Sequence, residues 1–294
     1  MSFPILATHK QKAKIMTDQS VMMSENGRYK ISKRIDQGSI TIYEAQDSTN
    51  GQLVEIVKIS VINFEDYKSK IDPLKEFFCN LSTIHPNIVE YIDLFFDQEN
   101  LYSVRKKING MDLATLMESK KWSYLRTPDF TAKVALEVCK VLALLHREQF
   151  IHRSVTPTNI YIEFSGKNEP DYYNPKVKLC GFESAQFRSL EIFDSGKTPI
   201  SIGYSSPEQL LRHSTLIDGT SDLFSLAVTM YEFASKTKPF FNKNSELIMS
   251  IQLNSPLTKH VRIPVHLIDE INSYNKTYQL LFQKLGREPT SKEI

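Results

Sequence analysis

The first third of the chain alternates polar with apolar or aromatic positions, which is the pattern of half-buried strands. The alternation runs over 29–35 and 40–45, and the stretch 53–62 is rich in Val and Ile. Turn-forming clusters stand between these segments, at 36–39 and 47–51. The pattern therefore predicts three antiparallel strands that are joined by tight turns.

The pattern then predicts one helix over 64–83 and two more strands over 88–96 and 101–107. Residues 1–28 carry no sustained period, so we expect a flexible extension there.

Beyond residue 110 the apolar spacing becomes helical. Apolar side chains recur at helix spacing at Phe130, Val134, Val138, Val141, Leu142 and Leu145. Residues 223–234 are nearly all apolar and predict a buried helix, and 244–253 and 265–285 are also predicted to be helical. A strand-rich first third followed by a helix-rich remainder predicts an α+β fold with two lobes.

The composition narrows the class of protein. Hydrophobic residues make up 41% and charged residues 24%, which is typical of a globular chain rather than a disordered one. Thirty-six basic against 34 acidic side chains give a net charge of +2, which does not favour nucleic-acid binding. No apolar run reaches the ~20 residues that span a bilayer. Three well-separated cysteines fit a reducing compartment, so we expect a cytoplasmic protein.

Several landmarks follow one another in a fixed order along the chain. They are Lys58, Glu76, the loop His152-Arg153-Ser154-Val155-Thr156-Pro157-Thr158-Asn159, the tripeptide Gly181-Phe182-Glu183, Ser206-Pro207-Glu208 and Asp222. In this order they resemble the protein kinase family over about 29–290. The resemblance implies a bilobal fold, with a small antiparallel-sheet lobe and one main helix over 29–107. A larger helical lobe would cover 108–294 and be cut short at its end.

The resemblance also identifies the groups that phosphoryl transfer requires. Ser154 stands in the place of the aspartate base, Thr156 in that of the loop lysine, and Gly181 in that of the metal-binding aspartate. A hydroxyl cannot serve as that base at neutral pH, and losing a general base costs ~10²–10⁴-fold in rate. Asn159 alone remains of the metal ligands, so no metal site is expected.

The nucleotide pocket that the resemblance implies is eroded as well. If a nucleotide binds, the contacts would come from Gly38, Lys58, Glu76, Lys106, Ile108, Asp112 and Asn159, with Lys58 and Glu76 forming an ion pair. Three bulky side chains, Ile56, Arg105 and Tyr161, are expected to block the adenine position. We therefore expect no cofactor, although ATP could still bind without tightly held Mg²⁺.

Other family positions keep their residue type and are expected to have structural or regulatory roles. They are His152, Arg153, Phe182, Glu208, Asp222 and Arg287, the last as a partner for Glu208. The tripeptide at 181–183 also has a weak local similarity to the mixed lineage kinase domain-like pseudokinase. The segment 165–175 is longer than the family norm and is expected to form an exposed loop that could serve as a contact surface.

These features together indicate a pseudokinase that is not an enzyme. It would act as a scaffold, allosteric partner or decoy that binds another kinase or a signalling protein. The alternative is a weak or atypical serine/threonine protein kinase, or a nucleotidyl transferase, that still binds ATP through Lys58, Glu76 and Asn159.

Overall fold

A computed structural model provides the structure of the protein. It describes residues 5–6, 15–16, 22–23, 27–37, 40–60, 71–96, 100–165, 168–187, 190–191, 199–240, 242, 244–254, 280 and 283–284. Gly38, Arg287, nearly all of the expected 1–28 extension and most of the expected helix over 265–285 lie outside these residues.

A seven-stranded antiparallel sheet forms the first lobe, which we call the sheet lobe. Its strands are β2 (Ile15–Met16), β3 (Met22–Met23), β4 (Tyr29–Gln37), β5 (Ile40–Asp47), β6 (Leu53–Ser60), β7 (Tyr91–Phe96) and β8 (Asn100–Lys106). The order is β2-β4-β5-β6-β8-β7, and β3 pairs with β4 beside β2. The five strands predicted from residue 29 onward are confirmed, because alternating apolar positions place one face of each strand in a core.

Helix α2 (Ile71–Ile84) packs on one face of this sheet beside β7. Its buried side chains, Leu74, Phe78 and Leu81, follow the three- and four-residue spacing of one helix face. These residues share a core with Val57 and Ile59 of β6. The position of α2 therefore defines which face of the sheet looks toward the rest of the molecule.

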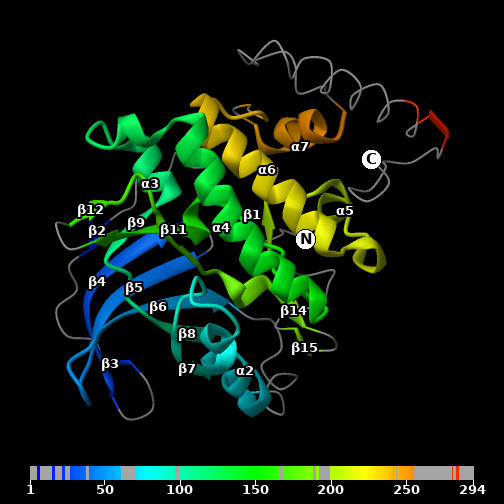
Figure 1. Cartoon of the computed structure of the whole chain (residues 1–294). Coiled ribbons are helices and arrows are strands. Elements are labelled where there is room, and N and C mark those ends of the chain that lie inside the picture. The colour runs from blue at the N-terminus through cyan, green and yellow to red at the C-terminus, as the bar shows by residue number, and fades with distance from the viewer. Residues whose placement is uncertain are drawn as a thin grey trace.

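Helices dominate the second lobe, which we call the helical lobe. They are α3 (Leu113–Glu118), α4 (Pro128–Arg147), α5 (Pro207–Leu210), α6 (Gly219–Ser235) and α7 (Ser245–Asn254). Figure 1 shows α4 and α6 running side by side at the centre of this lobe. The α4 helix begins at Pro128 because the Thr127 side chain caps it, accepting a hydrogen bond from the backbone N–H of Phe130, and proline is favoured directly after a cap.

The rest of the described structure contains short strands, which form small sheets apart from the sheet lobe. A small sheet is built by β9 (Gly110–Asp112), β11 (Ile160–Ser165), β12 (Glu169–Pro170) and β13 (Lys176–Leu179). The other short strands are β1 (Ile5–Leu6), β10 (Phe150–Ile151), β14 (Gln186–Phe187), β15 (Leu190–Glu191) and β16 (Ile200–Ser201). One continuous core runs from α2 through this small sheet into α4 and α6, so the α+β, two-lobed arrangement is confirmed.

Two leucines of α4 provide a test of this core. Leu142 is 1% exposed, whereas Leu136 on the opposite face is 57% exposed. Leu142→Ala should lower the free energy of unfolding by about 2–5 kcal/mol, because it removes buried methyl groups and leaves a cavity. Leu136→Ala is the matched control and should change it by less than about 0.5 kcal/mol. Urea denaturation measures both, and equal effects would contradict this placement of α4.

Candidate functional site

The cleft between the lobes is lined by one face of β6 and β8. Side chains of a strand alternate between its faces. Val57 shares the core of α2, and Glu55 is two residues away on the same face. Ile56 instead belongs to a second cluster on the far face, with Tyr43 and Val104. The expectation that Ile56 blocks the adenine pocket is therefore wrong, because its side chain leaves the sheet on the side away from the cleft.

The same alternation removes Lys58 from the cleft. Its neighbour across the β6–β8 pair is Tyr102, a member of the far-face cluster, and Nζ of Lys58 lies 5.9 Å from the centre of that ring. Glu76 is exposed on α2. These two described residues form no ion pair with each other, so the expected Lys58–Glu76 pair is absent and the expected nucleotide lysine points elsewhere.

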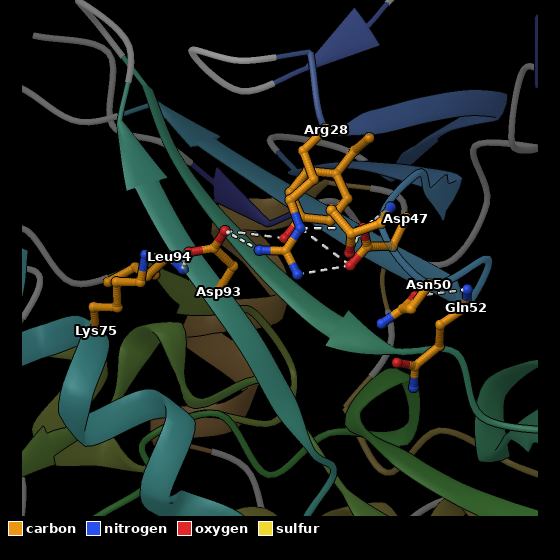
Figure 2. A network of polar contacts seen from close by, with 9 residues as sticks. Arg28, Asp47, Asn50, Gln52, Lys75, Asp93 and Leu94 are labelled. Carbon is orange, nitrogen blue, oxygen red and sulfur yellow. Dashed lines mark hydrogen bonds and ion pairs between the residues drawn. The ribbon is translucent and has the colours of Figure 1, made fainter.

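A polar network joins α2 to the sheet lobe next to Glu76. Figure 2 shows Lys75, the preceding residue of α2, reaching Asp93 of β7, with 2.6 Å between Nζ and Oδ1. Arg28 links Asp93 to Asp47, with Nη2 lying 2.7 Å from the latter carboxylate. The Tyr29 hydroxyl also donates to Asp93 over 3.0 Å. Leu74, Phe78 and Leu81 form the buried face of α2, and Glu76 lies outside that face and is exposed.

Arg105 supplies the positive charge that the cleft contains. The side chain is only 2% exposed, and its Nη2 lies 2.9 Å from Oε2 of Glu55 on the neighbouring strand. The guanidinium also lies 5.7 Å from the ring centre of Tyr161, which comes from β11 of the helical lobe. Burial opposes the charge, but the nearby Cys180 and Glu55, followed by two tyrosines, outweigh it and raise the pKa of Arg105. The two expected blocking residues, Arg105 and Tyr161, thus meet in the cleft.

A second contact joins the lobes at the Gly181-Phe182-Glu183 segment. Ser103 of β8 donates to Oε1 of Glu183 over 2.5 Å. The hydroxyl of Tyr91 lies 3.5 Å from the same oxygen and accepts the backbone N–H groups of Gly181 and Phe182. Burial raises the pKa of Tyr91, so its hydroxyl stays protonated. Oε1 of Glu183 therefore helps to hold the segment against the sheet lobe.

The loop around His152 is held by one buried carboxylate. Asp222 of α6 accepts the backbone N–H groups of His152, at 2.9 Å, and Arg153, at 2.7 Å. These bonds stabilise a left-handed backbone at Arg153, with φ of 61°. The His152 side chain meets the Cys180 carbonyl at 3.0 Å, and burial lowers the pKa of His152. The loop is thus positioned from its backbone, without the help of a catalytic side chain.

Other residues that keep the family's residue type also make structural contacts. Nε of Arg153 donates to the Ser184 carbonyl over 2.6 Å, and the Phe182 ring packs 4.5 Å from that of His152. The Glu208 carboxylate accepts the Ser221 hydroxyl.

Ser154, Asn159 and Gly181 come together where the metal and base would lie. Nδ2 of Asn159 donates to the carbonyl and to the hydroxyl of Ser154, at 2.8 and 3.1 Å. Gly181 has φ of 86°, and a Cβ added there would collide with the Asn159 amide. The described residues also contain no group of three His, Cys, Asp or Glu side chains that could hold a metal. At this position the described residues thus offer an amide and a hydroxyl and no carboxylate.

The remaining predicted residues are spread around the cleft. Thr156 bonds the Thr158 hydroxyl at 3.0 Å, Ile108 is buried in the core, and Lys106 is exposed with Nζ 3.4 Å from Glu90. Asp112 accepts the backbone N–H of Thr115 at 2.7 Å and so caps α3. Burial raises the pKa of Asp112 to about 6.

Glu55 and Ser103 were not predicted, although the sequence carried a signal for one of them. The run 53–60 carries Glu55 and Lys58, and the run 101–106 carries Arg105 and Lys106, so Glu55 and a basic residue of the second run are candidates for a cross-strand pair. The signal for Ser103 is weaker, because an uncharged serine in a strand does not indicate an oppositely charged partner on the neighbouring strand.

Comparisons with known proteins agree with this architecture. A family model described as the protein kinase domain matches residues 29–292. Similar proteins include the probable serine/threonine-protein kinase PknB of Lactococcus lactis, which is 26% identical over 219 residues, covering 72% of this chain and 32% of the relative. PrkC of Bacillus subtilis is 26% identical over 241 residues, which cover 80% of this chain and 35% of the relative. Human Nek2 is 28% identical over 267 residues, which cover 86% of this chain and 50% of the relative. The chain thus spans about a third to a half of these relatives.

These comparisons overturn one expectation. The chain was predicted not to be an enzyme, but the relatives it matches are named serine/threonine-protein kinases. The similarity therefore points to a kinase enzyme.

The buried pair in the cleft can be tested by a double-mutant cycle. Glu55→Leu leaves Arg105 buried without its partner and should lower the free energy of unfolding by about 3–5 kcal/mol. The double variant Glu55→Leu/Arg105→Met removes both charges and should recover most of that loss. Urea denaturation of the four proteins measures the coupling, and a double variant as unstable as Glu55→Leu would contradict the pair.

Asp112 makes a pH-dependent contribution to stability. Its pKa is raised from 3.8 to about 6 in the folded protein, so the folded state keeps a proton that the unfolded state has lost. Stability should therefore fall as the pH rises from about 4 to 6, by at most about 3 kcal/mol. Asp112→Asn keeps the cap and should remove this slope. Unfolding at pH 5 and 7.5 tests the difference, and parallel profiles for both proteins would contradict it.

Proposed function

The chain belongs to the protein kinase family, and from this premise we propose a serine/threonine-type kinase with severely impaired phosphoryl transfer. It would act in signalling mainly through the proteins it binds, as a scaffold, an allosteric partner or a decoy. The partner would be another kinase or a signalling protein. We place this activity in the cytoplasm.

The occupied cleft is the observation that carries the proposal. Arg105, paired with Glu55 and stacked over Tyr161, fills the space between the lobes with buried side chains. A nucleotide would have to displace this pair, and breaking a buried ion pair is costly. Lys58 lies on the other face of β6 and is not in position to replace the lost phosphate contact.

The contrast between chemistry and framework supports a binding role. Asp222 still holds the loop backbone at His152 and Arg153, while Ser154 and Gly181 offer no carboxylate for a base or a metal. Nucleotide binding, where it occurs, would be weak and would not depend on tightly held Mg²⁺.

No helix among the described residues is long and apolar enough to cross a bilayer.

Phosphoryl transfer and thermal stability test the proposal together. We expect transfer at least ~100-fold slower than that of the B. subtilis PrkC kinase domain on a generic protein substrate, since the general base is missing. Millimolar ATP with Mg²⁺ should stabilise the chain by well under the ~2.7 kcal/mol given by a ligand at 100 times its dissociation constant.

Two variants serve as controls for the residual activity. Lys58→Ala should leave the residual rate unchanged because this side chain lies on the far face of β6. Ser154→Ala should also leave it unchanged, because a hydroxyl does not act as a general base at neutral pH. A rate within tenfold of PrkC that is lost on Lys58→Ala would refute the proposal.

A further inference from the structure

A groove of about 580 Å³ opens on the helical lobe and shares no lining residue with the cleft. One wall is α4, with Lys133, Leu136 and Glu137, and the other is the segment 173–178 that leads into β13. The turn at Pro86 and Asn87 closes one end. The groove thus lies between three segments that are distant in sequence, one of them the extended loop noted above.

Two apolar side chains at the groove are strongly exposed. Leu136 is 57% exposed and Tyr173 is 77% exposed. The loop that carries Tyr173 is fixed in place, because the preceding Tyr172 stacks on Phe130 with 5.6 Å between ring centres. Oδ1 of Asp171 accepts the backbone N–H of Tyr173 over 2.8 Å. Exposed apolar side chains on a fixed wall indicate an interaction surface.

The charges of the groove favour an acidic partner. Three lysines line it, and no ion pair of the described residues involves Lys176 or Lys178. Lys178 donates to the Pro86 carbonyl over 2.6 Å, which fixes its ammonium in the groove. Glu137 is compensated from outside by Lys140, at 2.6 Å. Glu163 faces Lys176 across the β11–β13 pair. Lys133 is compensated in the same way by Asp129, at 2.8 Å, so the lining keeps an excess of one positive charge.

We propose that this groove binds a peptide segment of a partner protein in which an aromatic or aliphatic side chain is flanked by acidic residues. The apolar side chain would pack on Leu136 and Tyr173, and the carboxylates would meet Lys176 and Lys178. The inference rests on the proposed binding role and names the chemistry of the partner. Charge complementarity around an apolar contact gives both specificity and a fast association rate.

The test is fluorescence anisotropy with the full chain at low salt. The probe is a labelled peptide with one Phe between two pairs of acidic residues, and two comparison peptides carry Lys for the acidic residues or Ser for the Phe. The acidic peptide should bind at least ~10-fold tighter than the lysine peptide, a difference of ~1.4 kcal/mol. Added salt should weaken its binding. Equal binding of the two peptides, or no binding of the acidic one, overturns the proposal.

Matched variants locate the binding. Lys176→Glu and Leu136→Gln should each weaken binding at least ~5-fold, about 1 kcal/mol. Lys30→Glu on β4 and Leu247→Gln on α7 replace exposed residues far from the groove lining and should have no effect. Unchanged binding in both groove variants, or equal losses in the controls, overturns the site.

The residual phosphoryl-transfer rate separates this inference from the proposed function. Lys176→Glu should leave that rate unchanged, because the groove and the cleft share no residue. A rate near that of PrkC with intact peptide binding would refute the impaired-kinase proposal and leave the groove in place. Slow transfer together with a failure to bind the acidic peptide would refute the groove proposal and leave the impaired-kinase proposal in place.

Discussion

The alternation of side chains along β6 is the constraint on which the cleft depends. A strand cannot direct neighbouring residues to the same face, so the position of Val57 against α2 decides the positions of Glu55 and Lys58. The carboxylate enters the cleft, and the ammonium leaves it for the ring of Tyr102. One buried apolar side chain thereby determines which charges the space between the lobes receives.

The two lobes hold their segments at the cleft by different kinds of contact. In the helical lobe, the loop keeps its backbone geometry because Asp222 bonds main-chain N–H groups, which any sequence at 152–154 provides. In the sheet lobe, the geometry depends on side chains, and Lys75 rather than Glu76 is the residue of α2 that finds a partner. Backbone-mediated support tolerates substitution, whereas side-chain pairs are replaced by other pairs.

The sequence predicted the larger part of the fold and a smaller part of the site. Strands from residue 29 and the helices around Phe130 and Leu226 follow from apolar periodicity, which depends only on local spacing. The family resemblance placed both Arg105 and Tyr161 at the adenine position, but it did not predict that the two side chains lie against each other. The face of Lys58 was not predicted, because motif order fixes the position of a residue along the chain but not the rotation of its strand against a helix. The groove beside Tyr173 is formed by segments that are far apart in the sequence, and no local pattern predicts that they lie close together in space.

The contact between Gly181 and Asn159 bears on how this cleft can change over time. The Asn159 amide occupies the space that any side chain at 181 would need. A single substitution that returned an aspartate to this position would therefore meet a collision before it met a metal. The Asn159 side chain would have to turn away, and the left-handed backbone at 181, with φ of 86°, would have to accept a residue other than glycine. The residue type at position 181 therefore determines which rotamer is open to Asn159, so the two positions are coupled through space and not through a bond.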